Sequence, residues 1–238
     1  MATRIILARH GESTVNVIML ATDDHENNPL TDLGSSQAAD LAARVHGEPI
    51  SKIYTSPTQR ARETGSIVAA ELGLPIAIEW GLEEVRVGRH AGEVGEPWML
   101  RVKSDFRRWF ADEDLSHGYD GGETGYEAAR RTAAALHLIA ERHEGETVLV
   151  VSHGGAIALT VSTLCANVRL RDLDTRHVAN CATVEVTFDS GTWTCLAWMG
   201  TAPEDFSDDD ATTDVLHRDF DDDGDGSVSQ GLDAGLRT

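Results

Sequence analysis

The chain has 238 residues, of which 41% are hydrophobic and 25% charged, a composition typical of a globular protein. No run approaches the roughly eighteen apolar residues that a membrane helix needs. A net charge of −20, from 20 basic and 40 acidic residues, disfavours binding to nucleic acid or to an anionic membrane. The N-terminal residues show no secretory pattern, so we expect a cytoplasmic protein.

Charge divides the chain into two parts. Residues 204–238 hold 12 acidic and 2 basic residues, against 28 acidic and 18 basic residues before them. Such a segment buries too little apolar surface to offset its ordering entropy, so we predict one domain over residues 1–203 and a disordered acidic tail over 204–238. Residues 221–232 begin like a calcium-binding EF-hand loop, but Leu232 stands where a bidentate glutamate belongs, and a solvated tail is favoured.

The spacing of apolar residues predicts the elements in chain order, beginning with a buried strand at residues 5–8 and a loop to about residue 29. The later elements are a helix between Thr31 and Gly47, a strand at 52–55, a helix from Ser56-Pro57 to Leu72, a strand at 76–79, irregular chain at 82–95, a helix at 97–110, a glycine-rich turn at 117–122, a long helix from Tyr126 to Ala140, a strand at 147–151, a helix to about residue 164, and a hairpin at 183–188 and 192–198. This alternation implies an α/β three-layer sandwich with a mainly parallel central sheet and helices on both faces.

Side-chain chemistry gives further detail for four of these helices. Thr31 and Ser56 are each expected to cap the helix that follows. The helix at 97–110 should bury one face, formed by Met99, Val102, Phe106 and Phe110. The long helix should likewise bury Tyr126, Ala129, Ala133, Leu136 and Ala140.

Two predicted strands end in the same pair of residues, a histidine followed by a glycine. Arg9-His10-Gly11 follows the first strand, and Ser152-His153-Gly154-Gly155 follows the strand at 147–151. Ligands of such sheets bind at the carboxyl ends of the strands, so both imidazoles should reach the same edge. Imidazole, guanidinium and a glycine that lets backbone amides approach a ligand suit a tetrahedral anion such as phosphate.

The same residue types suit phosphoryl transfer through a covalent intermediate. Neutral histidine is a competent nucleophile, and Arg60, in the first turn of its helix, is placed to hold the same anion. The leaving oxygen needs a proton, for which Glu84 is the candidate and Glu83 the alternative. Because no HxH, HExxH or GxxxxGK[ST] pattern is present, we expect no metal and no cofactor.

Several blocks occur in a fixed order along residues 4–200: Arg9-His10-Gly11-Glu12-Ser13 with Asn16, Pro29-Leu30-Thr31 with Gly34 and Gln37-Ala38, Ser56-Pro57 with Arg60-Ala61 and Thr64, Leu82 with Glu84 and Gly88, Gly121-Gly122-Glu123-Thr124, and Ser152-His153-Gly154-Gly155. In these blocks the sequence resembles the histidine phosphatase superfamily, in its phosphoglycerate mutase-like branch. The resemblance implies that His10 is the phosphorylated nucleophile, that Arg9, Arg60 and His153 hold the phosphoryl group, and that Glu84 is the proton donor. It also implies that Asn16 contacts substrate and that no metal takes part. Gly11 and Gly154 are expected to bind substrate beside the two histidines.

Three functions remain open, and the first is our leading hypothesis. It is a metal-independent phosphatase that hydrolyses small phosphorylated metabolites through phospho-His10. The alternatives are a phosphoglycerate mutase, which returns the phosphoryl group to its substrate, and a non-catalytic module that binds a phospho-ligand or a protein. The Ser-His-Gly-Gly sequence at 152–155 and the short connection between Gly88 and Gly121 favour the phosphatase. The natural substrate and the oligomeric state are left open.

Other reactive residues have simpler interpretations. The remaining histidines are expected to be packed or surface residues: His25, His46, His90, His117, His137, His143, His177 and His217. The three cysteines lack CxxC spacing and should pack as apolar residues: Cys165, Cys181 and Cys195. The basic residues in the helix at 97–110 indicate either a lid that grips a second anionic group or, as favoured, an amphipathic helix with a solvated face.

Overall fold

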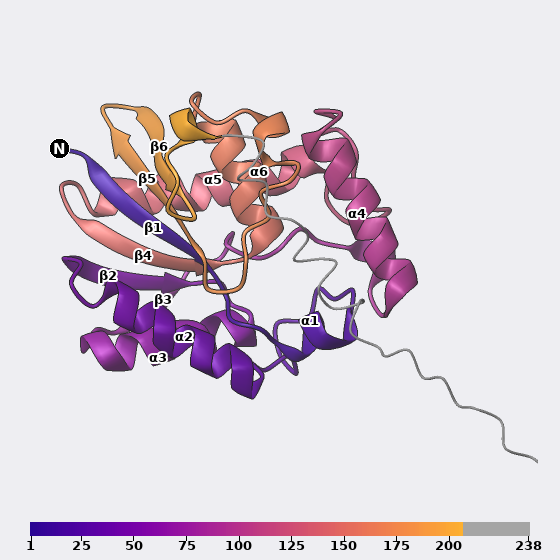
Figure 1. Ribbon diagram of the computed structural model, residues 1–238, viewed down its shortest axis with the longest axis horizontal. Helices are drawn as coiled ribbons and strands as arrows, with labels where there is room; N and C mark the ends of the chain where they lie inside the picture. Colours follow the sequence, from indigo (N-terminus) through magenta and orange to yellow (C-terminus); the bar gives the residue numbers. More distant parts are fainter. Residues whose placement is uncertain (207–238) are drawn as a thin grey trace, which may run out of the picture.

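The computed structural model describes residues 1–206, whose strands form one six-stranded sheet in the order β3-β2-β4-β1-β5-β6 (Figure 1). The strands are β1 (Thr3–Arg9), β2 (Ile50–Thr55), β3 (Ile76–Ile78), β4 (Thr147–Ser152), β5 (Thr183–Asp189) and β6 (Thr192–Trp198). The helices are α1 (Thr14–Ile18), α2 (Asp32–Val45), α3 (Gln59–Leu72), α4 (Glu96–Phe110), α5 (Gly125–Arg142) and α6 (Gly154–Leu164). β1 to β4 are parallel to one another, and β5 is antiparallel to β1 and β6. The predicted mainly parallel sheet is therefore confirmed.

Alternating side chains of the central strands join two separate cores. Ile5 and Leu7 of β1 pack in the core that includes residues of α5 and α6, whereas Ile6 and Ala8 pack in the core that includes residues of α2 and α3. Figure 1 shows α2 and α3 below the sheet and α5 and α6 above it. The predicted three-layer sandwich is confirmed. Helices cover both faces of the sheet, so the carboxyl edge of the parallel strands is where a site can form.

Two helix ends show where the local sequence signals hold and where one fails. Thr31 caps α2, since its Oγ1 accepts a hydrogen bond from Gly34 N at 3.0 Å. The prediction that Ser56 caps the next helix is wrong, because α3 begins at Gln59, after Thr58. Ser56 instead hydrogen-bonds through its Oγ to His153 Nε2 at 2.9 Å. Its hydroxyl group belongs to the sheet edge rather than to the helix.

Three further predictions need correction. The predicted loop before residue 29 contains α1, whose five residues are too few to show helical periodicity. Tyr126 is exposed, because the buried face of α5 begins at Gly125, which packs against Trp109. In α4 the buried face is centred on Trp98, Asp105, Trp109 and Phe110, while Met99, Val102 and Phe106 are half-buried.

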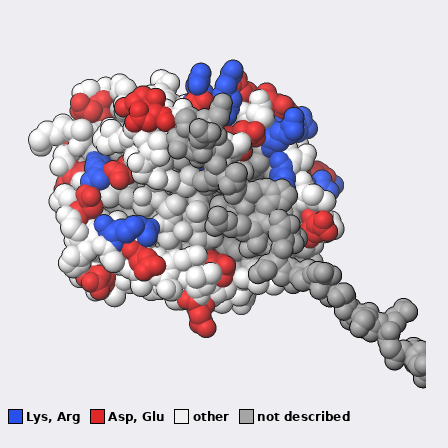
Figure 2. Space-filling model, in the orientation of Figure 1, with Lys and Arg blue, Asp and Glu red and all other residues white. Residues whose placement is uncertain are grey.

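The basic residues of α4 include two that form ion pairs at the surface. Arg101 Nε lies 3.7 Å from Glu93 Oε2, and Arg108 Nη2 lies 2.7 Å from Asp114 Oδ2. On the face shown in Figure 2, acidic and basic side chains lie next to one another rather than gathered by sign. The interpretation of α4 as an amphipathic helix with a solvated face is supported.

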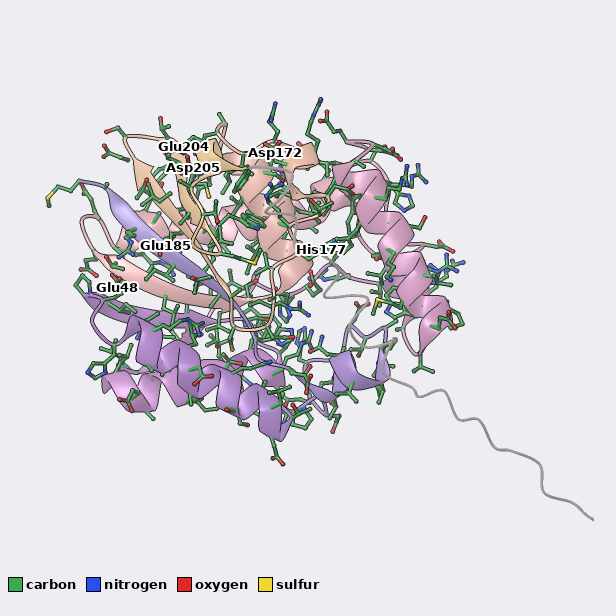
Figure 3. The ribbon with its side chains drawn as sticks, in the orientation of Figure 1. Glu48, Asp172, His177, Glu185, Glu204 and Asp205 are labelled. Atoms are coloured by element: carbon green, nitrogen blue, oxygen red, sulfur yellow. The ribbon has the colours of Figure 1, made fainter. Side chains whose placement is uncertain are left out.

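At the start of β1, opposite the histidine-bearing end, Arg4 bridges two carboxylates. Its guanidinium forms ion pairs with Glu48 and with Glu185 Oε2, the latter at 2.6 Å, and Figure 3 labels both acidic residues near this end of the strand. No helix within residues 1–206 is long and apolar enough to cross a membrane. Residues 207–238, with the EF-hand-like segment and most of the predicted acidic tail, lie outside the described residues.

Candidate active site

His10 and His153 lie together at the carboxyl edge of the sheet, as predicted. The parallel ladder pairs Arg9 of β1 with Ser152 of β4, so the residue after each strand reaches the same level. His10 N donates to Ser152 O at 3.0 Å, and the two imidazole centroids are 5.1 Å apart. Both side chains are buried, at 4% and 0% exposure.

The contacts of His10 determine which ring nitrogen is free to react. Nδ1 lies 2.6 Å from the carbonyl oxygen of Gly11, which can only accept, so Nδ1 carries the hydrogen. Nε2 then holds the lone pair and accepts a hydrogen bond from Arg60 Nε at 3.1 Å. Nε2 is thus the nucleophilic atom of His10, and it points at a guanidinium group.

Arg60 joins the two imidazoles. Its Nη2 donates to His153 Nδ1 at 3.2 Å, while its buried Nη1 has no hydrogen-bond partner among residues 1–206. Burial lowers the pKa of Arg60 to about 10, so the group stays charged at neutral pH. A buried cation with an unpaired donor is costly unless an anion occupies the site.

Arg9 approaches the same edge from the end of β1. Its Nη1 donates to Val178 O at 2.9 Å, and burial lowers its pKa below the usual value. Gly154, the first residue of α6, lies beside it: a Cβ there would be 3.4 Å from Arg9 Cδ. The structure therefore places both predicted arginines near the two histidines.

The surroundings of both histidines favour the neutral imidazole. Burial, and then the positive charge of Arg60, lower the pKa of His10 and that of His153 well below the usual value of 6.5. Nε2 of His153 faces Ser56 Oγ at 2.9 Å and Thr58 Oγ1 at 3.4 Å. Because Arg60 Nη2 donates to Nδ1, the hydrogen of neutral His153 lies on Nε2, which donates to Ser56 Oγ.

The two adjacent glutamates have different surroundings. Glu84 Oε2 accepts from Gly155 N at 3.1 Å, and Glu84 Oε1 accepts from Ala156 N at 2.8 Å, which seats the carboxyl group on the first turn of α6 beside His153. Glu83 is buried, with its Oε2 bound to Gly81 N at 2.6 Å and 3.6 Å from Arg131 Nη1. These contacts favour Glu84 over Glu83 as the group near the histidines.

Gly155 allows this approach of Glu84. A Cβ at Gly155 would lie 2.7 Å from Glu84 Oε1, so Gly155→Ala is expected to displace the carboxyl group. We expect kcat/KM for an alkyl phosphomonoester to fall about 10-fold or more, because a misplaced catalytic group loses much of its effect. Phosphate-release assays measure this. An equal loss in Gly47→Ala, where an added methyl meets no atom within 4 Å, would contradict the explanation.

Two of the predicted substrate contacts have structural partners of their own. Gly11 N donates to Thr64 Oγ1 at 3.0 Å, and a Cβ on Gly11 would lie 2.4 Å from Gly34 O. Asn16 Oδ1 accepts from Ser13 N and Ser13 Oγ, both at 3.0 Å, at the start of α1. These contacts support positioning roles, and substrate contacts by Gly11, Asn16 and Gly154 stay predictions.

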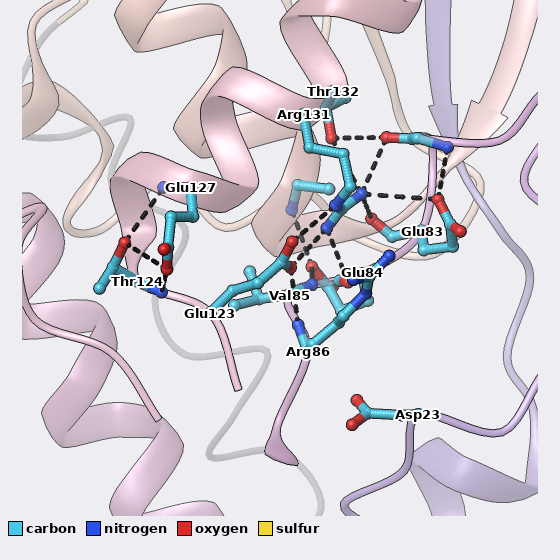
Figure 4. Close-up of polar contacts among 12 residues, drawn as sticks. Asp23, Glu83, Glu84, Val85, Arg86, Glu123, Thr124, Glu127, Arg131 and Thr132 are labelled. Atoms are coloured by element: carbon cyan, nitrogen blue, oxygen red, sulfur yellow. Dashed lines mark hydrogen bonds and ion pairs between the residues drawn. The ribbon is translucent and has the colours of Figure 1, made fainter. Parts of the chain in front are cut away.

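A small cleft, with a volume of about 30 Å³, opens beside this group. It is lined by Thr22, Asp23, Asp24, His25, Thr58, Arg60, Glu83, Glu84 and Arg86. Figure 4 shows Asp23 on a separate loop that faces the segment carrying Glu83 to Arg86. None of the lining residues comes from α4; the walls of the cleft are built by the loop after α1, the start of α3 and the segment after β3.

Three groups at or beside the site were not predicted from the sequence: the hydroxyl groups of Ser56 and Thr58 and the partly buried side chain of Arg131. Ser56 follows β2 as the two histidines follow β1 and β4, and this shared position at a strand end was a usable signal. Arg131 lies within α5 and carries no such signal. Among residues 1–206, no group of three or more His, Cys, Asp or Glu side chains is arranged to hold a metal ion.

Two buried imidazoles and two guanidinium groups at the carboxyl edge of a parallel sheet define an α/β protein suited to bind a phosphoryl group. The family model of the histidine phosphatase superfamily (branch 1) matches residues 5–201. The chain belongs to this superfamily, which confirms the predicted class of enzyme, a histidine phosphatase.

Similar proteins include two named after different reactions. The chain is 32% identical over 158 residues to a metal-independent phosphoserine phosphatase of Arabidopsis thaliana, covering 65% of this chain and 66% of that one. It is 29% identical over 201 residues to a protein of Yersinia enterocolitica described as "probable phosphoglycerate mutase GpmB", covering 82% and 90%. A mycobacterial glucosyl-3-phosphoglycerate phosphatase structure matches with a TM-score of 0.68 at 22% identity, over 84% of this chain and 100% of that one. This last likeness confirms the fold.

Proposed function

We propose that the protein hydrolyses phosphomonoesters of small metabolites without a metal ion, through a phosphohistidine on His10. The observation that carries this proposal is the fixed tautomer of His10, whose Nε2 lone pair lies 3.1 Å from the buried cation of Arg60. A nucleophile and a charge for the equatorial oxygens are thereby placed together. The similarity to a phosphoserine phosphatase supports a phosphomonoester as substrate.

In the first half-reaction, His10 Nε2 attacks phosphorus and the bond from phosphorus to the ester oxygen breaks. Arg60 and Arg9 offset the charge on the phosphoryl oxygens, and Glu84 gives a proton to the leaving oxygen. In the second half-reaction, water attacks phosphorus, the phosphorus–nitrogen bond breaks, and the Glu84 carboxylate takes the proton of the water. For His153 Nδ1 to donate to a phosphoryl oxygen, Arg60 Nη2 must turn from Nδ1 to the phosphoryl group, and the Ser56 hydroxyl group must donate to Nε2.

Phosphate release from p-nitrophenyl phosphate and from 3-phosphoglycerate, measured with excess EDTA, tests the proposal. We expect release from at least one of them and, after quenching in alkaline detergent, which preserves the acid-labile phosphorus–nitrogen bond, an added mass of one phosphoryl group on the peptide that contains His10. Abolition of release by EDTA would contradict the metal-independent mechanism.

Two other outcomes would favour the competing functions. Isomerisation of 3-phosphoglycerate faster than release of phosphate would indicate a mutase. Tight binding of phosphate with no turnover would indicate a binding module. The exposed Asp23 and Asp24 along the cleft support the phosphatase, because polar walls let water reach the intermediate.

A further inference from the structure

One partly buried guanidinium group outside the phosphoryl-binding set ties the segment that carries Glu84 to α5 (Figure 4). The side chain of Arg131 is only 15% exposed. Its Nη1 donates to the carbonyl oxygens of Gly81 at 2.8 Å and Glu83 at 3.0 Å, and its Nη2 donates to that of Glu84 at 3.1 Å. The segment has no regular secondary structure, and one guanidinium group therefore provides hydrogen bonds to three of its backbone carbonyl groups.

Glu123 completes the arrangement from the other side. Its Oε1 accepts from Arg131 Nε at 2.8 Å and its Oε2 from Arg131 Nη2 at 2.7 Å. The same Oε2 accepts from Arg86 N at 3.0 Å, and Glu123 N donates to Arg86 O at 2.9 Å. The backbone is thus held at Glu84 itself, before it at Gly81 and Glu83, and after it at Arg86.

The guanidinium group of Arg131 is used to its full capacity. Burial alone would lower the pKa of Arg131, but the hydrogen bonds and charge of Glu123 outweigh burial and raise the pKa above its usual value. Its five N–H groups meet two oxygens of Glu123 and three backbone carbonyl oxygens, and Nη1 makes a longer contact with Thr132 Oγ1 at 3.4 Å. Lysine keeps the charge but cannot reproduce this planar fork.

We propose that Arg131 is a positioning residue that acts through Glu84, by fixing the backbone from which its carboxyl group reaches both α6 and the leaving oxygen. The inference rests on the proposed function, in which Glu84 protonates the leaving group. Arg131 itself does not line the cleft, so it has no direct contact with substrate there. A small shift of the segment would move a proton donor that must lie within hydrogen-bond reach.

A residue that acts through the proton donor matters most when the leaving group needs a proton. The p-nitrophenolate ion leaves without one, whereas the alkoxide of glycerol 3-phosphate does not. We therefore expect Arg131→Lys to lower kcat/KM for glycerol 3-phosphate about 10-fold and that for p-nitrophenyl phosphate less than about 2-fold. The ratio kcat/KM reports the phosphorylation half-reaction, in which the leaving group departs. Arg130→Lys, at the exposed neighbouring position, is the matched control and should change neither value.

A double-mutant cycle tests the route of the effect. Glu84→Gln should show the same dependence on the leaving group, and more strongly, and Arg131→Lys should cause almost no further loss in that background. Equal losses for both substrates, or additive losses in the double variant, would show a merely structural role and overturn the inference. Should Arg131→Lys fail to unfold cooperatively, Glu123→Gln, which loosens the same guanidinium group, must show the dependence or the inference is wrong.

Failure of the proposed function has a different signature. If Glu84→Gln loses activity equally on both substrates, Glu84 is not the proton donor, and the mechanism itself is overturned. If Glu84→Gln shows the dependence on the leaving group, and both Arg131→Lys and Glu123→Gln do not, the mechanism is supported and the positioning role of Arg131 is wrong.

Discussion

His10→Ala is expected to lower phosphate release at least about 10⁴-fold, because the variant lacks the atom that forms the covalent intermediate. The measurement is kcat/KM with p-nitrophenyl phosphate in the presence of EDTA, together with a search for the phosphorylated peptide. The added mass should disappear with the activity. Far-ultraviolet circular dichroism and thermal unfolding should show a folded protein, since the substitution removes a buried polar ring beside two cations.

The matched control for this variant is His46→Ala. His46 is exposed at the end of α2, and its ion-pair partner is Glu71 rather than any residue of the candidate site. It should retain the activity of the original protein. Residual release in His10→Ala above about one part in a hundred of the original rate would show that the nucleophile lies elsewhere.

Arg60→Gln is expected to lower kcat/KM about 10²- to 10³-fold, because the buried cation that offsets charge on the phosphoryl oxygens is lost. A second effect follows from its position 3.1 Å from His10 Nε2. After burial, the charge of Arg60 is the largest cause of the low pKa of His10, so its removal lets that pKa rise toward 6.5. The acid limb of the kcat/KM profile should then move to higher pH, because the neutral nucleophile is lost earlier as pH falls.

The substrate's own ionisation contributes equally to both proteins, so the comparison with the original enzyme isolates the shift. Arg142→Gln, which removes an exposed guanidinium group paired with Glu79, should change neither the rate nor the profile. A slow Arg60→Gln enzyme whose acid limb is unmoved would show that the charge of Arg60 does not govern the ionisation of His10.

The sequence predicts the centre of the site because the ends of two strands are marked by the same residue pattern. Apolar residues followed by His-Gly locate His10 and His153, and parallel pairing then brings them to one edge. Ser56 was misassigned because a serine before proline is also a helix-capping pattern, and only the paired strands show that its hydroxyl group faces His153. At such residues the local sequence pattern indicates one role, and the position of the side chain in the assembled sheet determines another.

The support around the site could not be predicted in the same way. The bonds of Arg131 depend on how α5 is rotated and on where an irregular segment passes it, and neither follows from periodicity. The same limit explains Tyr126, whose exposure depends on Gly125 packing against Trp109 rather than on spacing within the helix. Contacts between distant segments need the assembled fold.

The pairing of β1 with β4 and β5 also bears on how the protein is made. The first strand of the chain has as neighbours only strands that are synthesised much later, so it stays unpaired until residues 147–152 have left the ribosome, and its second neighbour follows with residues 183–189. His10 and His153 cannot meet before that moment. Contacts so distant in sequence form late and slowly, and a growing chain therefore carries no phosphoryl-binding site until its sheet is nearly complete.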